Sequence, residues 1–379
     1  MANPFTDLLS GLSNKLSGKK QSVLGIDIGS SSIKMVQLSM REGHPVLDTY
    51  GELALGPYAG KGVGESTNLP LMKIIEAIND MLREKEVNIS TRLSGMAIPF
   101  SSSLMAVIEL PGLPQKQLAE MVPIEARKYI PVPISEVTLD WYVIPKDKNP
   151  EDNVPYTKDS KAPLEKLEVL VVALHNETIN SYKEIVTKCN LDASFFEIEI
   201  FSTMRSVLDQ EIAPMLIIDM GASTTKLYIV ERGILRSSHM VNRGSHKITD
   251  ELSKSLGISI ADAEYLKREK GLPGEINGIE MKKVMILTLN YIFSEANQFI
   301  LAYQKKYNKN INKVFLVGGG SALKGIVDVA KENFQTEVVA GDPFAKVVAP
   351  AFLEKVLRET GPEFTVAMGV ALRRLQELE

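Results

Sequence analysis

The stretch IDIGSSSIKMVQL, which begins at Ile26, decides the fold, because IDMGASTTKLYIV, which begins at Ile218, repeats its pattern about half a chain later. Four positions align at one constant offset: Asp27 with Asp219, Gly29 with Gly221, Ser31 with Ser223, and Lys34 with Lys226. Internal repeats indicate a duplicated architecture. We therefore predict two related lobes, each opening with an apolar strand, an aspartate and a Gly/Ser/Thr-rich turn into a second strand.

The composition of this turn favours phosphate chemistry. Glycine lets the backbone approach a ligand closely, and successive turn amides can form an anion-binding nest. An aspartate at a strand end can hold a hydrated magnesium ion, which prefers oxygen ligands and keeps several waters. One such hairpin is weak evidence, since turns favour these residues anyway, but two facing copies would clamp a triphosphate. The chain has no GxxxxGK[ST] loop, and Gly29 leads into a strand rather than the helix of a dinucleotide-binding fingerprint.

A third element, VFLVGGGSALKG, reads as a buried strand, a glycine loop and a helix that begins near Leu323. Its three glycines, Gly318, Gly319 and Gly320, permit a close backbone pass against which a flat adenine base could lie. The alternative is an ordinary strand–helix turn, which would not need three glycines.

The overall composition is that of a soluble globular protein. The chain has 43 basic and 47 acidic residues and a net charge of −4, with no basic stripe of the kind that nucleic-acid binding requires. A single cysteine, Cys189, cannot form a disulfide within the chain. The N-terminus lacks the pattern of a signal peptide, and the longest unbroken apolar run is far shorter than the ~20 residues of a membrane span. These features favour a cytoplasmic location.

Two segments stand apart from the α/β pattern. Residues 1–21 carry apolar side chains at helical spacing, which predicts a short helix packed on the body, a frayed tail, or a helix that contacts a membrane or partner. Residues 96–166 read as a small inserted subdomain with short strands around a helix from Gln115 to Tyr129, followed by a charged loop from residue 145 to 166. Trp141 could belong to the core of this subdomain or anchor a partner.

The helix of the inserted subdomain predicts a groove. Its apolar face, at Leu118, Val122 and Ala126, would pack on the strands of the subdomain. Further apolar residues are then left to line a partner groove, in which an extended peptide could gain hydrogen bonds from a sheet edge and pockets from the helix. These candidate groove residues are Met121, Tyr129 and Ile130.

With these residues in view, the chain resembles the actin-like ATPase superfamily. IDIGSSSIK is similar to its first phosphate motif, IDMGASTTK to the second and LVGGGSALKG to the adenosine motif; EIEIFSTMRSVL and FTVAMGVAL are similar to the two segments that connect the lobes. Within the superfamily, LGIDIGSSSIKMVQL, EMVPIEARKYIPVPI and AGDPFAKV resemble the PilM family of type IV pilus assembly proteins, which is related to the division protein FtsA.

The resemblance implies a division of the chain. An α/β actin-like ATPase fold would have two ribonuclease-H-like lobes around a nucleotide cleft, with an FtsA-type 1C subdomain inserted in the first. The first lobe (1A) would comprise residues 22–95 and 167–210 with a C-terminal helix at 364–379. The remaining parts would be subdomain 1C at 96–166, the second lobe (2A) at 211–245 and 308–363, and subdomain 2B at 246–307.

The resemblance also implies roles for residues around ATP or ADP. Magnesium would be held through water by Asp27 and Asp219. Phosphate contacts would come from Gly29, Ser30, Ser31 and Lys34 in one lobe and from Gly221, Ala222, Ser223 and Thr224 in the other. Ribose and base contacts would come from Glu264, Lys267, Gly318, Gly319 and Gly320. Glu264 and Lys267 could instead form a plain surface ion pair. Glu199 would lie near the attacking water, or be a solvated surface carboxylate.

The family implies a cytoplasmic scaffold at the inner face of the inner membrane. It would bind the cytoplasmic N-terminal peptide of PilN in a groove between 1A and 1C, and join PilO and PilP through PilN. ATP would be structural or regulatory, with at most slow hydrolysis, and self-association is left open. A second hypothesis is an FtsA-like membrane tether, although such chains carry a linker and amphipathic helix after the last lobe, whereas this one ends at Glu379. A third is a small-molecule kinase, for which no substrate base is evident.

Overall fold

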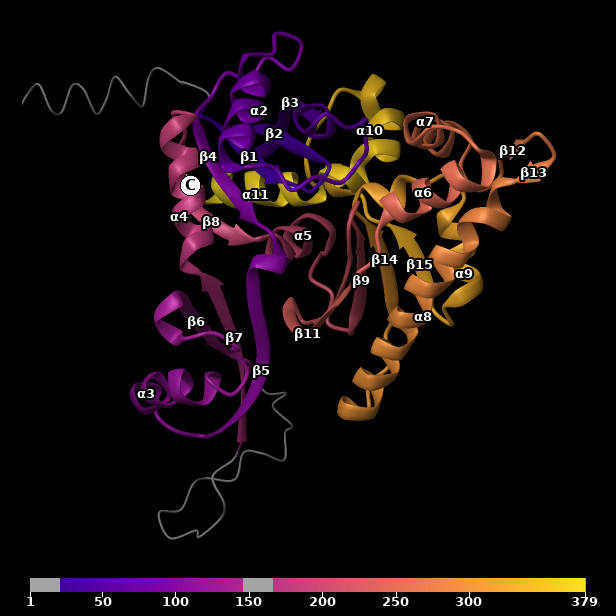
Figure 1. Cartoon of the computed structure of the whole chain (residues 1–379). Coiled ribbons are helices and arrows are strands. Elements are labelled where there is room, and N and C mark those ends of the chain that lie inside the picture. The colour runs from indigo at the N-terminus through magenta and orange to yellow at the C-terminus, as the bar shows by residue number, and fades with distance from the viewer. Residues whose placement is uncertain (1–20, 146–165, 379) are drawn as a thin grey trace, which may run out of the picture.

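The computed structural model describes residues 21–145 and 166–378, which form two lobes with a smaller subdomain projecting from the first (Figure 1). The expected N-terminal helix and the charged loop after residue 145 fall outside the described residues.

The first lobe is built on a five-stranded sheet in the order β3-β2-β1-β4-β8. The predicted strand–turn–strand is confirmed as an antiparallel hairpin of β1 and β2, in which Asp27 lies opposite Lys34. The strands β4 and β8 then extend the sheet in parallel with β1. The strand β3 was not expected from the sequence. The bounds are β1 Ser22–Ile28, β2 Ser32–Arg41, β3 His44–Ala54, β4 Leu93–Ile98 and β8 Asp192–Ile198.

The second lobe repeats this topology. Its five-stranded sheet has the order β11-β10-β9-β14-β15, again a three-stranded antiparallel part continued by two parallel strands. Asp219 lies opposite Lys226, the same register as in the first lobe. The repeat in the sequence is therefore a repeat of structure. The bounds are β9 Met215–Met220, β10 Thr225–Glu231, β11 Ile234–Val241, β14 Lys313–Val317 and β15 Glu337–Ala340.

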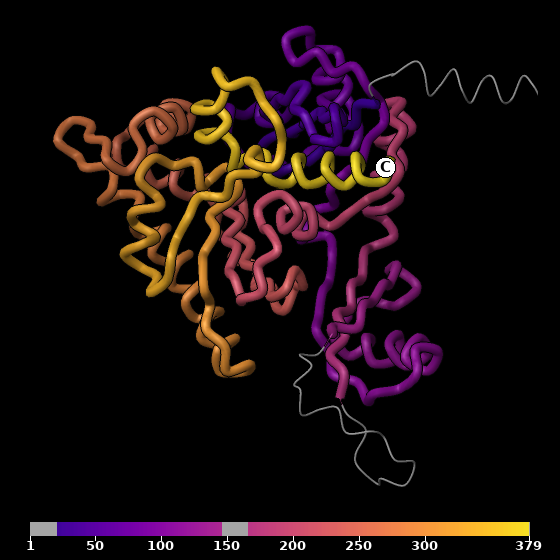
Figure 2. The backbone as a smooth tube through the Cα atoms, turned by 180° about the vertical axis from the view of Figure 1, so that it is seen from behind, coloured from indigo at the N-terminus to yellow at the C-terminus, as the bar shows by residue number. Residues whose placement is uncertain are grey.

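Helices cover both faces of the first sheet, which explains why β1 has no polar side chain from Val23 to Ile26. On one face, Leu24 and Ile26 pack with α2 (Leu71–Arg83) and α4 (Asn176–Lys188). On the other face, Val23 packs with the C-terminal helix α11 (Thr365–Gln376), which crosses behind the first sheet (Figure 2). At the crossing of α11 with α5 (Glu199–Val207), a Cβ at Gly369 would lie 1.9 Å from the Ser202 carbonyl oxygen, so the two connecting helices are in direct contact.

The helices of the second lobe share one core with its sheet. Residues of β9 and β10 pack with α6, α7, α8 and α9 in a single cluster. The segment expected as a separate 2B subdomain is thus continuous with the core of the second lobe, and α8 alone spans 27 residues of it. The bounds are α6 Ser245–Leu256, α7 Ile260–Lys270, α8 Met281–Tyr307, α9 Ile326–Asn333 and α10 Glu354–Thr360, with a small hairpin of β12 Glu275–Ile276 and β13 Ile279–Glu280.

The inserted subdomain has different boundaries from those expected. Residues 96–98 belong to β4 of the first sheet, whereas β7 (Lys166–His175) is the central strand of the inserted sheet, in the order β5-β7-β6. The run LEVLVVAL is apolar from Val169 to Leu174 because one side of β7, with Val169 and Val171, faces α3, while Leu170 packs against the second lobe. The other elements are β5 Ser103–Pro111, α3 Gln115–Ala126 and β6 Val137–Val143.

Candidate functional site

The two phosphate turns have the same local structure. The Gly29 amide donates to the Ser32 carbonyl at 2.9 Å, and the Gly221 amide donates to the Thr224 carbonyl at 3.0 Å. The turns face each other closely enough that the Ser223 hydroxyl donates to Ser30 Oγ at 3.0 Å. Both lobes therefore bring a hydroxyl-bearing turn to one point, an arrangement suited to holding an anion from two sides.

The glycine loop is shaped by its contact with the second turn. Gly318 has φ of +82°, and a Cβ at this position would lie 2.4 Å from Asp219 Oδ1. Gly320 is packed on Met220 and Ser245, while Gly319 faces the more open side, with nothing nearer to its Cβ position than Glu363 at 3.9 Å. Gly318 and Gly320 thus serve the packing of the loop, and Gly319 is the glycine that a ligand can approach.

The two aspartates lie at matching strand ends and line the same cavity. Desolvation by burial, opposed by Lys34, raises the pKa of Asp27 from 3.8 to about 7, and the neighbouring Glu199 adds to the shift. Asp219 Oδ2 is buried and accepts no hydrogen bond from the described residues; it lies 3.5 Å from Lys226 Nζ. A bound cation would stabilise the ionised form of Asp27 and would offer a partner to Asp219 Oδ2. Mg²⁺ is commonly held by one or two carboxylates and keeps several of its waters.

Glu199 is neither a surface carboxylate nor a free base. It is buried, and both of its oxygens are engaged: Oε1 accepts from the Phe100 amide at 2.6 Å and Oε2 pairs with Lys226 Nζ at 2.7 Å. Burial alone would lower the pKa of Lys226, but Asp219 and Glu199 outweigh it and raise the pKa above the ordinary value. Glu199 therefore joins the second phosphate hairpin to the segment at Phe100 that leads into the inserted subdomain.

The predicted pair on α7 is part of the cavity wall. Glu264 and Lys267 are both buried, which rules out a plain surface ion pair. Lys267 Nζ donates to Glu264 Oε2 at 2.6 Å, as does the Thr249 hydroxyl at 2.6 Å, and Arg268 Nε donates to Glu264 Oε1 at 2.8 Å. Burial alone would raise the pKa of Glu264, but these partners hold it at about 2.

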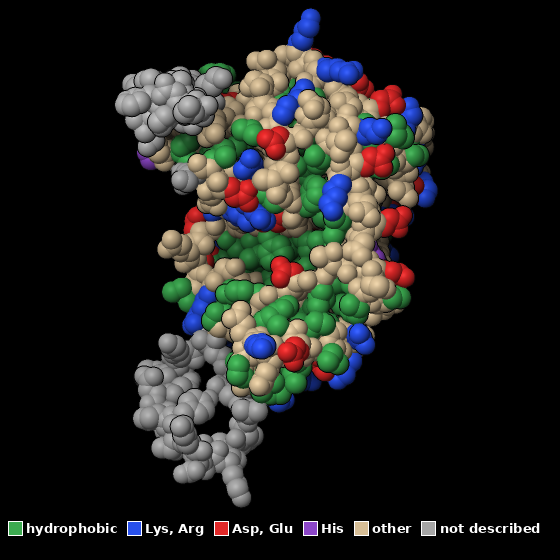
Figure 3. Space-filling view, turned by 90° about the vertical axis from the view of Figure 1, so that its left-hand side faces the viewer, with side chains coloured by type: hydrophobic (Ala, Val, Ile, Leu, Met, Phe, Trp, Pro, Cys, Tyr) green, Lys and Arg blue, Asp and Glu red, His purple; other side chains and the backbone are tan. Residues whose placement is uncertain are grey.

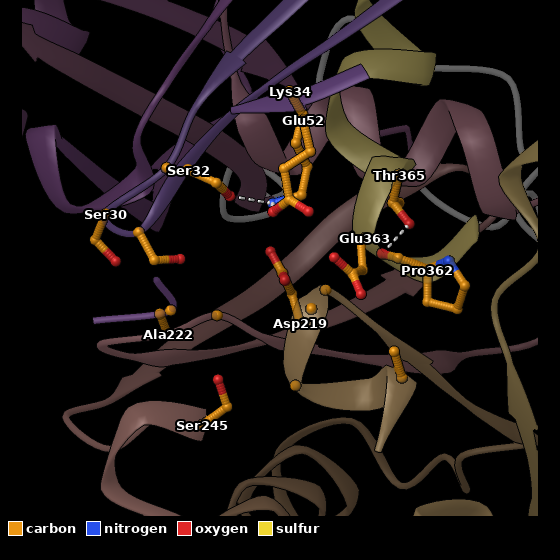
Figure 4. Close-up of a pocket in the computed structure, with 18 of the residues that line it drawn as sticks. Ser30, Ser32, Lys34, Glu52, Asp219, Ala222, Ser245, Pro362, Glu363 and Thr365 are labelled. Atoms are coloured by element: carbon orange, nitrogen blue, oxygen red, sulfur yellow. Dashed lines mark hydrogen bonds and ion pairs between the residues drawn. The ribbon is translucent and has the colours of Figure 1, made fainter. Parts of the chain in front are cut away.

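Together these elements enclose a cavity of about 270 Å³ that all the predicted nucleotide-site residues line. Figure 4 shows Lys34, Glu52, Asp219 and Glu363 pointing into the same space from both lobes and from the segment before α11. Lys34 Nζ is itself paired with Glu52 Oε1 at 3.2 Å. Sequence reasoning missed Lys226, Glu52, Arg268 and Glu363. Alignment with Lys34 in the repeat could have indicated Lys226, whereas Glu52 lies on the unexpected strand β3.

The predicted groove residues lie elsewhere, on the inserted subdomain. Tyr129 and Ile130 line a separate cavity of about 60 Å³ along the edge strand β5, although Ile130 is buried rather than exposed as expected. Met121 is absent from this cavity and packs against the core of the subdomain, as does Trp141. Met121 is only partly buried against this core, so its place in a partner groove stays a prediction. Figure 3 shows a hollow lined mainly by hydrophobic side chains between the first lobe and the inserted subdomain.

Comparisons with known proteins agree on the family and the fold. Residues 25–375 match the family described as type IV pilus assembly protein PilM. The cell division protein FtsA of Neisseria meningitidis is 22% identical over 346 residues, covering 84% of this chain and 83% of the relative. FtsA of Enterococcus faecalis is 22% identical over 345 residues, covering 83% of this chain and 77% of the relative.

Solved structures place the fold among actin-like ATPases. A PilM–PilN type IV pilus biogenesis complex superposes with a TM-score of 0.75 and 22% identity, covering 93% of this chain and 98% of the other. MreB5 of Spiroplasma citri bound to ADP superposes with a TM-score of 0.51 and 11% identity, covering 93% and 95%. The two-lobed architecture expected from the repeat is therefore confirmed.

Proposed function

The chain belongs to the type IV pilus assembly protein PilM family, and we propose on that premise that it is an ATP-binding scaffold of the pilus machinery, acting at the cytoplasmic face of the inner membrane. Its partner would be the N-terminal peptide of PilN, and PilO and PilP would join indirectly. ATP would order the cleft between the lobes rather than drive rapid turnover.

One observation carries the nucleotide part of this proposal. The turns of both lobes meet at Ser30 and Ser223, in a cavity that two carboxylates also line: Asp27, whose pKa is raised by burial, and Asp219, whose Oδ2 accepts no hydrogen bond from the described residues. The turns fit the phosphates, and the carboxylates fit a hydrated Mg²⁺ ion. The adenine base of the nucleotide would lie between Gly319 and α7. The ADP bound by MreB5, which shares this fold, supports a nucleotide as the ligand.

The partner part of the proposal rests on the junction between the first lobe and the inserted subdomain. The strand β5 is an edge of its sheet, and an edge strand can pair with an extended peptide. A cavity of about 660 Å³ includes Ser101 and Ser102, immediately before β5, and the smaller cavity with Tyr129 continues along Leu104 to Ala106. The similarity to a PilM–PilN complex supports PilN as the occupant.

A labelled PilN N-terminal peptide tests this proposal by fluorescence anisotropy. We expect Tyr129→Ala to weaken peptide binding at least tenfold, which is about 1.4 kcal/mol, because Tyr129 lines the cavity beside β5. Tyr142→Ala is the matched control: Tyr142 is 54% exposed, close to the 52% of Tyr129, but lies outside that cavity. Equal affinities of the two variants would place the peptide elsewhere. Mg·ATP titration of both variants separately tests the nucleotide site, which neither substitution touches.

Slow or absent hydrolysis fits the engagement of Glu199 with both Phe100 and Lys226. Rapid phosphoryl transfer needs a residue that orients the attacking group in line, and Glu199 would have to release one of these partners to do so. A turnover in the ordinary enzyme range of roughly 1–1000 per second would contradict the scaffold proposal.

A further inference from the structure

The long helix α8 presents an exposed face that the nucleotide and peptide sites do not use. Figure 1 shows α8 running from the hairpin of β12 and β13 down the second lobe, with its C-terminal end projecting below that lobe. Its other side is buried in the core of that lobe through Leu289, Phe293 and Ile300. On the exposed side, Leu287 is 69% and Leu301 62% accessible to solvent. Every exposed side chain of α8 between Lys283 and Lys305 is uncharged.

The exposed side chains follow the spacing of a coiled-coil seam. Leu287, Tyr291, Ser294, Gln298 and Leu301 succeed one another at intervals of four, three, four and three residues. Alternating intervals of three and four keep side chains on one stripe that can pack against a second helix. The Tyr291 ring is held by the Arg243 guanidinium, 3.8 Å from the ring centroid. The stripe is thus displayed by a helix that is rigidly packed on its other side.

Four exposed positions of this face are symmetric about Ser294 once Asn290, which lies beside Tyr291, is included; the counterpart of Tyr291 itself is the partly buried Asn297. Leu287 and Leu301 each lie seven residues from Ser294, and the amides Asn290 and Gln298 each lie four residues from it. In an antiparallel pair of such helices that cross at Ser294, each Leu287 meets the Leu301 of the other copy, and each Asn290 meets a Gln298. We propose that α8 is the interface of a two-fold symmetric dimer of this chain, with the two helices antiparallel and Ser294 on the axis.

The chemistry of the stripe favours a second copy over a lipid surface. A bilayer would bury Asn290, Ser294 and Gln298 without hydrogen-bond partners, which is costly, whereas a second copy supplies an amide for each amide. The small Ser294 side chain lets the two helices approach closely at the crossing. Lys283 and Lys305 of different copies meet only at the exposed ends, where Glu280, which pairs with Lys283 at 2.8 Å, supplies a counter-charge.

Sedimentation of the full chain over a wide concentration range tests the proposal. We expect a concentration-dependent dimer, and we expect Leu287→Arg and Leu301→Arg each to weaken it at least tenfold. Phe352→Arg is the control, since Phe352 is 82% exposed but lies outside α8. A wild-type chain that stays monomeric, or a dimer lost equally in Phe352→Arg, would overturn the proposal.

Cysteine cross-linking tests the orientation and does not depend on the arginine variants folding. The sole native cysteine, Cys189, is buried, so the background is low. A two-fold axis at residue 294 brings the two copies of Ser294→Cys within the Cα separation that a disulfide requires, roughly 4.4–6.8 Å. Under a mild oxidant Ser294→Cys should therefore form a covalent dimer, whereas Leu287→Cys should not. Cross-linking of Leu287→Cys, or none with Ser294→Cys, would contradict the antiparallel arrangement.

Discussion

Replacing Asp27 by Asn should stabilise the nucleotide-free protein while weakening Mg·ATP binding. Burial raises the pKa of this carboxyl from 3.8 to about 7, so the ionised form is disfavoured in the folded state. Asparagine has nearly the same shape and cannot ionise. It also cannot contribute charge to a hydrated magnesium ion. The substitution therefore separates two effects of the carboxylate: it destabilises the nucleotide-free fold, and it is proposed to help bind magnesium. Ligand sites commonly lose stability in exchange for function in this way.

The magnitude follows from the pKa shift. Each unit is worth about 1.4 kcal/mol, so the full shift amounts to about 4 kcal/mol. Asp27 retains partial solvent contact at the cleft. We therefore expect Asp27→Asn to gain roughly half of this amount in free energy of unfolding at a pH above 7. Between pH 4 and 7 the unfolded chain loses a proton that the folded chain keeps, so wild-type stability falls as pH rises through this window and levels off above it. The advantage of Asp27→Asn should grow over the same window.

Thermal unfolding without nucleotide, at several pH values from 5 to 8, measures this effect. We expect Asp27→Asn to melt roughly 2–4 °C above the wild type at pH 8 and by less at pH 5. Asp209→Asn offers a control, because this side chain is 83% exposed and its replacement should change the melting temperature little. Calorimetric titration at pH 8 should show Mg·ATP affinity reduced at least tenfold. A variant that is less stable than wild type at pH 8, or an advantage independent of pH, would refute the reasoning.

Three further predictions concern the cleft. Asp219→Asn should lower Mg·ATP affinity at least tenfold, about 1.4 kcal/mol, because Asp219 Oδ2 has no hydrogen-bond donor among the described residues; calorimetry that finds wild-type affinity in the folded variant would remove Asp219 from the site. Gly29→Val should abolish the thermal stabilisation by ATP, about 2.7 kcal/mol at a hundred times the dissociation constant, because a Cβ there already lies 3.1 Å from the Ser32 carbonyl oxygen; a wild-type shift in melting temperature would exclude this turn. Glu199→Gln should retain ATP binding but lose any slow hydrolysis in a phosphate-release assay, and an unchanged rate would assign Glu199 a purely structural role.

The family comparisons confirm the fold that the repeat predicts. A phosphate-binding turn is made of neighbouring residues, so its glycine, hydroxyls and aspartate must be contiguous in the chain, and Gly29 and Gly221 could be recognised without any tertiary information. The predicted cleft residues do converge on one cavity. Their contacts with ATP and magnesium stay predictions, which the calorimetric titrations test.

Other features depended on which elements pack together. The apolar run of β7 is compatible with the centre of either sheet, since burial on both faces leaves the same pattern, and only strand pairing assigned it to the inserted subdomain. Glu52 and Glu363 are separated by most of the chain yet point into one cavity. Ile130 is apolar in the sequence whether it faces solvent or core, and only packing shows that it is buried. The chemistry of a turn depends on adjacent residues and can be recognised in the sequence, whereas burial and the pairing of distant charges depend on tertiary packing.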